Sequence, residues 1–171
     1  EIRRLQVLVE GNVPQEYQKL FTNLQNTGNT EGATSSSLVD KLPKFTPEME
    51  DVFWLGCFAR YELDPNFTKS VENFAKILDT AGVSYGILEN EHCSGDPANR
   101  LGDKLTYARL REHNIELLKN SSKVVSMCPH CVANLHEEYS KYGDISYRVE
   151  HHSQLIGRLI EEGKIGVNIG D

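Results

Sequence analysis

From Val52 onward, short apolar segments of strand length alternate with longer segments in which apolar residues recur at helical spacing. The strand candidates are Val52–Leu55, Val83–Leu88, Lys123–Met127 and Ile145–Val149. One helix separates each pair of consecutive strands. Every connection is then a crossover that returns the chain to the same edge of the sheet, so the strands must run parallel. The order βαβαβαβα therefore predicts an α/β fold with a roughly four-stranded parallel sheet and βαβ crossovers.

Local signals mark where the first of these helices begins and ends. Asp64 and Pro65 supply an N-cap and a first-turn proline. Apolar residues follow at helical spacing as far as Ala81, and Gly82 suits a left-handed C-cap. The same pattern predicts further helices over residues 105–120, 131–143 and 154–162.

The first part of the chain follows a different pattern. A helix is expected from about Pro14 to a stop near Gly28. The stretch Asn26–Ser37 is rich in Asn, Thr, Ser and Gly, which is typical of an irregular connection. We therefore expect a domain boundary near Pro47. The expected organisation is a helical linker segment over 1–47 and a cysteine-rich α/β domain over 48–171.

Charge and hydropathy argue against two classes of function. The formal net charge is -7 and no cluster of Lys and Arg is visible, so a nucleic-acid partner is not expected. No run of about eighteen apolar residues occurs, so no membrane span is expected within the segment. The sequence begins with Glu1 rather than Met and no signal peptide follows. We therefore expect a segment of a longer polypeptide with a cytoplasmic location.

All four cysteines fall at one predicted edge of the sheet. Cys57 follows the first strand, Cys93 lies in the loop after the second, and Cys128 follows the third, with 35 and 34 residues in the two intervals. The carboxyl ends of parallel strands share the edge at which open α/β sheets bind ligands. Cys131 joins them from the first turn of the next helix. We therefore expect the four thiols to converge.

The surroundings of these cysteines favour thiolates, the form that binds metals. Gly95 permits close approach of the backbone, Pro97 suits the start of a helix, and Cys131 lies at a helix start. A disulfide framework is not expected, because the domain is large and shows no sign of secretion. Isolated buried cysteines usually serve packing, but here every cysteine lies at the same predicted edge. The pattern therefore predicts a metal site with Cys57, Cys93, Cys128 and Cys131.

Histidines also gather near this edge, at positions 92, 130, 151 and 152. For each of them a structural or exposed role is expected before ligation, and one is a candidate hydrogen-bond donor to a sulfur. The residues expected around the ligands are Ser94, Gly95, His130 and His151. No catalytic residue is assigned, because electron transfer requires neither a general base nor a nucleophile.

Three other functions compete with this interpretation. Cys128-Pro129-His130-Cys131 is a Cys-x-x-Cys at a helix start, as in thiol–disulfide oxidoreductases, but no later proline is available to face the motif. Four thiolates also form an ordinary tetrahedral zinc site in a structural α/β domain, which the sequence does not distinguish from an iron site. The last alternative is a docking surface with a decayed metal site, and the survival of all four cysteines argues against it.

The order of these motifs resembles the cysteine-rich CCG domain of heterodisulfide-reductase-type iron–sulfur oxidoreductases, including relatives associated with electron-transfer flavoprotein. The resemblance is carried by Cys57, by Cys93-Ser94-Gly95 and by Cys128-Pro129-His130-Cys131. The segments Leu8–Pro14, Cys93–Gly102 and Glu150–Ile156 are also similar to phrases of that family, so the resemblance covers nearly the whole chain. It implies a [4Fe–4S] cluster with the four cysteines as ligands.

The resemblance also implies partners. In the family a ferredoxin-like domain lies upstream, sometimes after a membrane segment, and a second cysteine-rich domain lies downstream. This segment would then relay electrons within a larger oxidoreductase at the cytoplasmic face of a membrane, with electron-transfer flavoprotein as a candidate partner. One position departs from the family motif, which has two adjacent cysteines where this chain has Cys93 and Ser94. Four thiols suit a cubane cluster and a relay better than a catalytic disulfide-reducing role.

Overall fold

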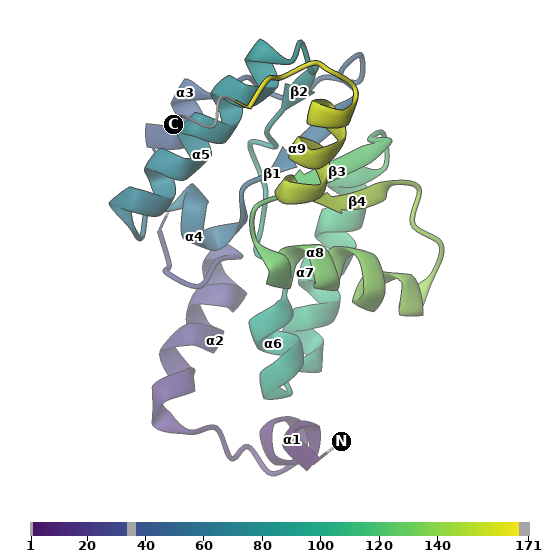
Figure 1. Ribbon diagram of the computed structural model, residues 1–171. Helices are drawn as coiled ribbons and strands as arrows, with labels where there is room; N and C mark the ends of the chain where they lie inside the picture. Colours follow the sequence, from purple (N-terminus) through teal and green to yellow (C-terminus); the bar gives the residue numbers. More distant parts are fainter. Residues whose placement is uncertain (1, 34–36, 168–171) are drawn as a thin grey trace.

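The computed structural model describes residues 2–33 and 37–167, and a four-stranded parallel sheet lies at its centre (Figure 1). The strands are β1 (Asp51–Trp54), β2 (Tyr85–Gly86), β3 (Lys123–Ser126) and β4 (Arg148–His151). They lie in the order β2-β1-β3-β4, and every neighbouring pair is parallel. The predicted α/β class with a parallel sheet and crossover connections is confirmed.

Two strands differ in extent from the predicted ones. β2 is much shorter than Val83–Leu88, because the chain after it pairs with the segment that precedes β1. Ile87 bridges to Lys44, and its amide donates to the Pro43 carbonyl at 2.8 Å. β4 begins at Arg148 rather than Ile145, since its pairing with β3 begins only there. Both differences concern length and leave the predicted parallel arrangement intact.

Helices cover both faces of the sheet (Figure 1). Val52 and Trp54 of β1 pack in one buried cluster, and Phe53 and Leu55 pack in the other. The first cluster includes residues of α2 (Gln15–Thr27), α6 (Asp96–Leu101) and α7 (Lys104–Leu118), and the second includes residues of α3 (Ser37–Lys41), α5 (Pro65–Thr80) and α9 (His152–Glu161). Burial on both faces explains why Val52–Leu55 is a continuous apolar run.

The predicted helix signals have the expected geometry around α5. The Asp64 side chain accepts the amides of Asn66 and Phe67 at 2.7 and 2.9 Å, and Pro65 occupies the first turn. Gly82 follows the helix with a φ of +66°. The boundaries of α5 are therefore set by its own sequence.

The helical region after β3 differs from the prediction. It begins at Pro129 rather than Cys131, because proline suits the first helical position. It is also not one regular helix. α8 (Pro129–Ala133) continues into the π-helical turn η2 (Asn134–Glu138) and the 3₁₀ turn η3 (Tyr139–Tyr142). A further short helix that was not predicted, α4 (Gly56–Arg60), directly follows β1.

The segment before β1 packs onto the sheet-bearing part of the chain. α1 (Ile2–Arg4) and the π-helical η1 (Leu5–Val9) precede α2, which matches the predicted N-terminal helix and ends at Gly28 in a left-handed C-cap. Leu24 of α2 and Leu38 of α3 are fully buried, one in each cluster.

Residues 34–36 of the predicted irregular connection lie outside the described residues. The division near Pro47 stays a prediction. Across the described ranges, no helix is long and apolar enough to cross a membrane.

Candidate metal centre

Cysteines from three strand ends come together at the carboxyl edge of the sheet. Cys57 lies in the first turn of α4, Cys93 in the loop after β2, and Cys128 and Cys131 at the start of α8. Their thiols form two hydrogen-bonded pairs, Cys57 with Cys93 and Cys128 with Cys131. Cys131 also interacts electrostatically with both thiols of the other pair. All four cysteines are free of disulfide bonds.

Within each pair one sulfur accepts a hydrogen bond and the other donates it. The hydrogen bond from Cys93 lowers the pKa of Cys57. The hydrogen bond from Cys131, followed by the amides of Cys131 and His130, lowers the pKa of Cys128 to about 6. The pKa values of the donors Cys93 and Cys131 are raised, because their protons are engaged and their thiols are buried. The lowered pKa favours the thiolate form of Cys128, the form that binds metals.

A buried carboxylate joins two of the cysteine loops. Glu91 Oε2 accepts the amide of Leu55 at 3.0 Å, and Oε1 accepts the amide of Gly56 at 2.7 Å. The residue is 3% exposed, and burial raises the pKa of its carboxyl to about 7. Glu91 thus ties the turn that leads into Cys57 to the loop that carries Cys93.

Gly56 brings the turn after β1 against the other cysteine pair. Its φ is +71°, a conformation that favours glycine. A Cβ atom at this position would lie 3.2 Å from Cys131 Sγ and 3.7 Å from Cys128 Cβ. The backbone of this turn is therefore one wall of the site.

Gly56→Ala is expected to reduce metal binding beyond its effect on stability. The new Cβ atom would displace the Cys131 sulfur by a few tenths of an ångström, and the left-handed backbone adds about 1–2 kcal/mol of strain. Gly82→Ala is the matched control, because Gly82 has a φ of +66° and nothing within 4 Å of its Cβ position. Thermal unfolding should show losses in both variants, and metal content after anaerobic reconstitution should fall only in Gly56→Ala. Equal metal contents would contradict the contact.

The loop after α2 covers the same site. The amide and hydroxyl of Thr30 donate to Cys57 and contribute to its lowered pKa. The amide of Cys93 donates to the Gly28 carbonyl at 2.7 Å. Asn29, which is 1% exposed, fixes the loop, because its side-chain oxygen accepts two loop amides at 3.0 and 3.2 Å. Part of the stretch predicted to be an irregular connection therefore contributes to the site.

The loop that carries Cys93 supplies further polar groups. The Gly95 amide donates to Cys93 Sγ at 3.4 Å, and the Ser94 hydroxyl donates to Cys131. Gly95 has a φ of +87°, and a Cβ atom there would lie 2.8 Å from the Tyr107 ring. Ser94 and Gly95 thus lie beside the sulfurs.

The histidines near this edge have different surroundings. His130 contributes its amide and its charge to the lowered pKa of Cys128. His151 is engaged at the start of α9, where its amide donates to Gln154 Oε1 at 2.9 Å and its Nδ1 lies 2.8 Å from Ser153 Oγ. His92 stacks on the His113 ring at a centroid distance of 3.7 Å. Of the two histidines expected around the ligands, the structure brings His130 to a sulfur, whereas the hydrogen bonds of His151 in the described ranges lead elsewhere.

Several residues at the site were not predicted. Gly56 and Glu91 had a visible signal, since each stands within two residues of a cysteine. Thr30 had none, because only the packing of α2 against the sheet-bearing part brings it to the site. The same holds for the buried residues that support the Cys93 loop from α7, η2 and η3, namely Asn114, Asn134 and Tyr139.

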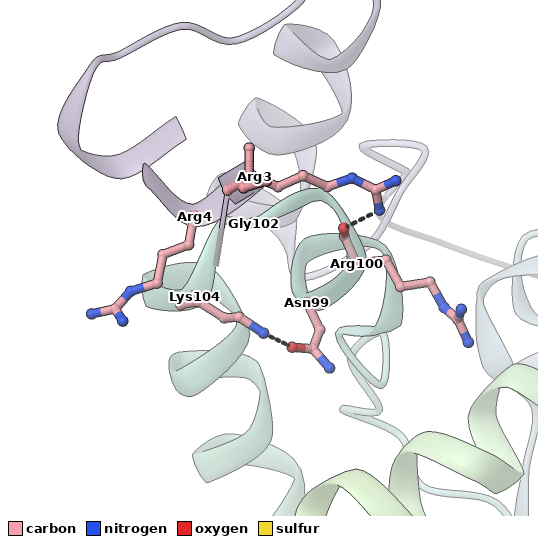
Figure 2. A pocket seen from close by; sticks show the side chains of 7 residues that line it. Arg3, Arg4, Asn99, Arg100, Gly102 and Lys104 are labelled. Atoms are coloured by element: carbon pink, nitrogen blue, oxygen red, sulfur yellow. Dashed lines mark hydrogen bonds between the residues drawn. The ribbon is translucent and has the colours of Figure 1, made fainter. Parts of the chain in front are cut away.

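A surface pocket lies elsewhere, between α1 and the α6–α7 connection (Figure 2). Arg3 Nη1 donates to the Arg100 carbonyl at 2.9 Å, and the Lys104 ammonium donates to the Asn99 side chain. Figure 2 shows the guanidinium groups of Arg4 and Arg100 pointing in opposite directions. The pocket is lined by none of the predicted site residues, and its charges do not converge on one point.

In the ranges that the structure describes, no three side chains of Cys, His, Asp or Glu are spaced to hold one metal ion.

Comparison with known proteins agrees with this site. Residues 52–136 match the family model of the cysteine-rich CCG domain, a range that contains all four cysteines. The chain is 32% identical to the EtfAB:quinone oxidoreductase of Syntrophomonas wolfei and 32% identical to the probable iron-sulfur-binding oxidoreductase FadF of Bacillus subtilis. It is 31% identical to a probable membrane-anchored ferredoxin of Chromohalobacter salexigens. No solved structure matches the chain.

The relatives are much longer than this chain. Each match covers 96% of the chain, but only 25%, 25% and 26% of the respective relative. The chain therefore spans about a quarter of the length of the curated relatives it matches. The family resemblance carried by the cysteine motifs is confirmed, and residues 52–136 of the chain belong to the family of cysteine-rich CCG domains.

Proposed function

We propose that this chain is an electron-transfer domain that binds an iron–sulfur cluster through Cys57, Cys93, Cys128 and Cys131, within a larger oxidoreductase. The observation that carries the proposal is the meeting of four thiols from three separate strand ends. The names of two relatives, an iron-sulfur-binding oxidoreductase and a ferredoxin, support it.

The cluster is proposed to be of the [4Fe–4S] type. Four thiolates match the four iron atoms of a cubane, one for each. Ser94 occupies the position where the family motif has a second adjacent cysteine, so a cluster that needs five thiols is not favoured.

The residues around the cysteines suit such a cluster. A bound cluster would supply reversible one-electron chemistry. The Thr30, Ser94 and Gly95 donors offset the negative charge of the sulfurs. Cys93 is 5% exposed and shielded from water, whereas Cys57 and Cys128 are half-buried. Two of the four proposed ligands are therefore partly accessible from the surface.

One observation favours a second function, thiol–disulfide exchange by Cys128 and Cys131. A thiol at a helix start with a pKa of about 6 is a suitable nucleophile. Cys57→Ala separates the two functions, because it removes a cluster ligand and leaves this pair intact. Exchange activity that survives in Cys57→Ala would support the second function, and loss of bound iron in the same variant would support the first.

The partners and location are proposed from the same family. A ferredoxin-like domain upstream and a second cysteine-rich domain downstream would supply the neighbouring redox centres, with electron-transfer flavoprotein as an external partner. Relatives about four times longer support the presence of further redox domains. We place the domain on the cytoplasmic side, held at the membrane by other parts of the polypeptide.

The test is purification without oxygen, followed by metal analysis and electron paramagnetic resonance of oxidised and reduced samples. Iron and sulfide in a stoichiometric ratio, with a paramagnetic signal in one redox state, are the expected result. Zinc as the only metal after anaerobic reconstitution with iron and sulfide, or no iron signal in either state, would contradict the proposal.

A further inference from the structure

Three buried polar side chains converge on the loop that carries Cys93. Asn114 lies in α7, Asn134 begins η2 and Tyr139 begins η3, and each is 0% exposed. The Asn114 amide donates to the Cys93 carbonyl at 3.0 Å and to the Tyr139 hydroxyl at 3.0 Å. The Tyr139 hydroxyl donates to the Ser94 carbonyl at 2.9 Å, and the Asn134 amide donates to the same carbonyl. Two donors from the core therefore meet on one backbone oxygen.

These side chains are an unusual choice for a buried position. Polar groups are costly to bury, and the Oδ1 atoms of both Asn114 and Asn134 are buried without a hydrogen-bond partner in the described structure. Apolar residues would fill the same space without this cost. Both asparagines use their side-chain NH₂ groups as donors. The Asn114 group donates to the Cys93 carbonyl and the Tyr139 hydroxyl, and the Asn134 group donates to the Ser94 carbonyl. Asn134 also begins a π-helical turn, a form often found at functional sites.

The carbonyl that receives two donors belongs to the peptide group joining Ser94 to Gly95. The amide of that same peptide group donates to Cys93 Sγ at 3.4 Å. Donors on the carbonyl oxygen polarise the peptide group and strengthen the hydrogen bond that its amide makes. The core donors and the sulfur are thus connected through a single peptide unit.

Hydrogen bonds to cluster sulfurs are one of the factors that set the reduction potential. They stabilise the reduced cluster more than the oxidised one, because the reduced cluster carries more negative charge. A stronger amide bond to Cys93 therefore raises the potential, and a weaker one lowers it. Burial raises the pKa of Tyr139 well above its ordinary value, so its hydroxyl keeps the proton that it donates.

We propose that Asn134 and Tyr139 are positioning residues that raise the reduction potential of the metal centre by polarising the Ser94–Gly95 peptide group. Neither side chain is hydrogen-bonded to a sulfur in the described ranges, so they act through the backbone. The inference rests on the proposed function, since it requires a redox-active cluster on Cys93.

Tyr139→Phe tests the inference with little disturbance. The phenyl ring retains the packing of the tyrosine ring. The hydrogen bond from Asn134 to the Ser94 carbonyl is retained, and so is the one from Asn114 to the Cys93 carbonyl. Tyr147→Phe is the matched control, because Tyr147 lies in the same buried cluster and its hydroxyl is buried without a partner in the described structure. Both variants of the full chain are purified without oxygen and titrated with dithionite, with the reduced cluster followed by electron paramagnetic resonance.

At the wild-type midpoint, the ratio of reduced to oxidised cluster is expected to fall roughly two- to fivefold in Tyr139→Phe, because one polarising bond is lost. It should stay unchanged in Tyr147→Phe, and iron content should match wild type in both. Equal potentials in the two iron-loaded variants would overturn this inference alone. A wild-type chain without a redox-active cluster would overturn the proposed function and the inference with it.

Discussion

Cys93→Ala is expected to abolish cluster binding while leaving a folded chain. Cys93 is the one cysteine supplied by the loop after β2, so no neighbouring thiol is available to replace it. Loss of a residue that only supports a ligand costs roughly 10- to 100-fold in metal affinity, and loss of the ligand itself should cost more. Iron content and the paramagnetic signal after anaerobic reconstitution measure the effect.

Ser94→Ala is the control for Cys93→Ala. It changes the adjacent residue of the same loop and removes the hydroxyl that donates to Cys131. The Ser94 carbonyl, which receives the Asn134 and Tyr139 donors, belongs to the backbone and is retained. Ser94→Ala should therefore keep its iron. If Cys93→Ala keeps its iron as well, the ligand set is wrong.

Part of the site could be predicted from the sequence pattern alone. The convergence of Cys57, Cys93 and Cys128 was predictable, because parallel strands end at one edge and each cysteine follows a strand. That inference needs only strand order and polarity, and it tolerates errors of several residues in strand length. The short β2 and the late start of β4 therefore did not affect it.

The residues that support the cysteines could not be predicted in this way, because their positions depend on contacts between segments far apart in the sequence. Thr30 reaches Cys57 only because α2 packs beside the sheet, and Asn134 reaches the Ser94 carbonyl from the π-helical turn after α8. Asparagine, threonine and serine in the N-terminal stretch predicted an irregular connection. The Asn29 side chain instead fixes a defined loop, because its oxygen accepts hydrogen bonds from two amides of that loop.

The polar groups also show why the cysteines have unequal environments. A sulfur that must become negative in a buried site needs donors, and the fold supplies them from different sources: the loop after α2 for Cys57, the Gly95 amide for Cys93 and the start of α8 for Cys128. Each source belongs to a different packed element. The charge on the site is therefore coupled to the packing of the surrounding layers.

Glu91→Met is expected to destabilise the chain by about 3–5 kcal/mol. Methionine has a similar length, but it leaves the buried amides of Leu55 and Gly56 without their acceptor. It also removes the negative charge beside Arg60, a buried residue whose guanidinium donates to the Leu88 carbonyl at 2.9 Å. Urea unfolding of the apoprotein followed by circular dichroism measures the change.

Two variants decide whether the lost hydrogen bonds cause the effect. Glu89→Met alters an exposed residue two positions away and should change the free energy of unfolding by no more than about 0.5 kcal/mol. Glu91→Gln keeps one oxygen acceptor but turns an NH₂ group toward the other amide, so its stability should fall between wild type and Glu91→Met. Because the turn that Glu91 holds leads directly into Cys57, the iron content of the three variants should follow the same order as their stability. A Glu91→Met chain as stable as Glu89→Met would mean that the turn before Cys57 is held by its own packing and not by the carboxylate.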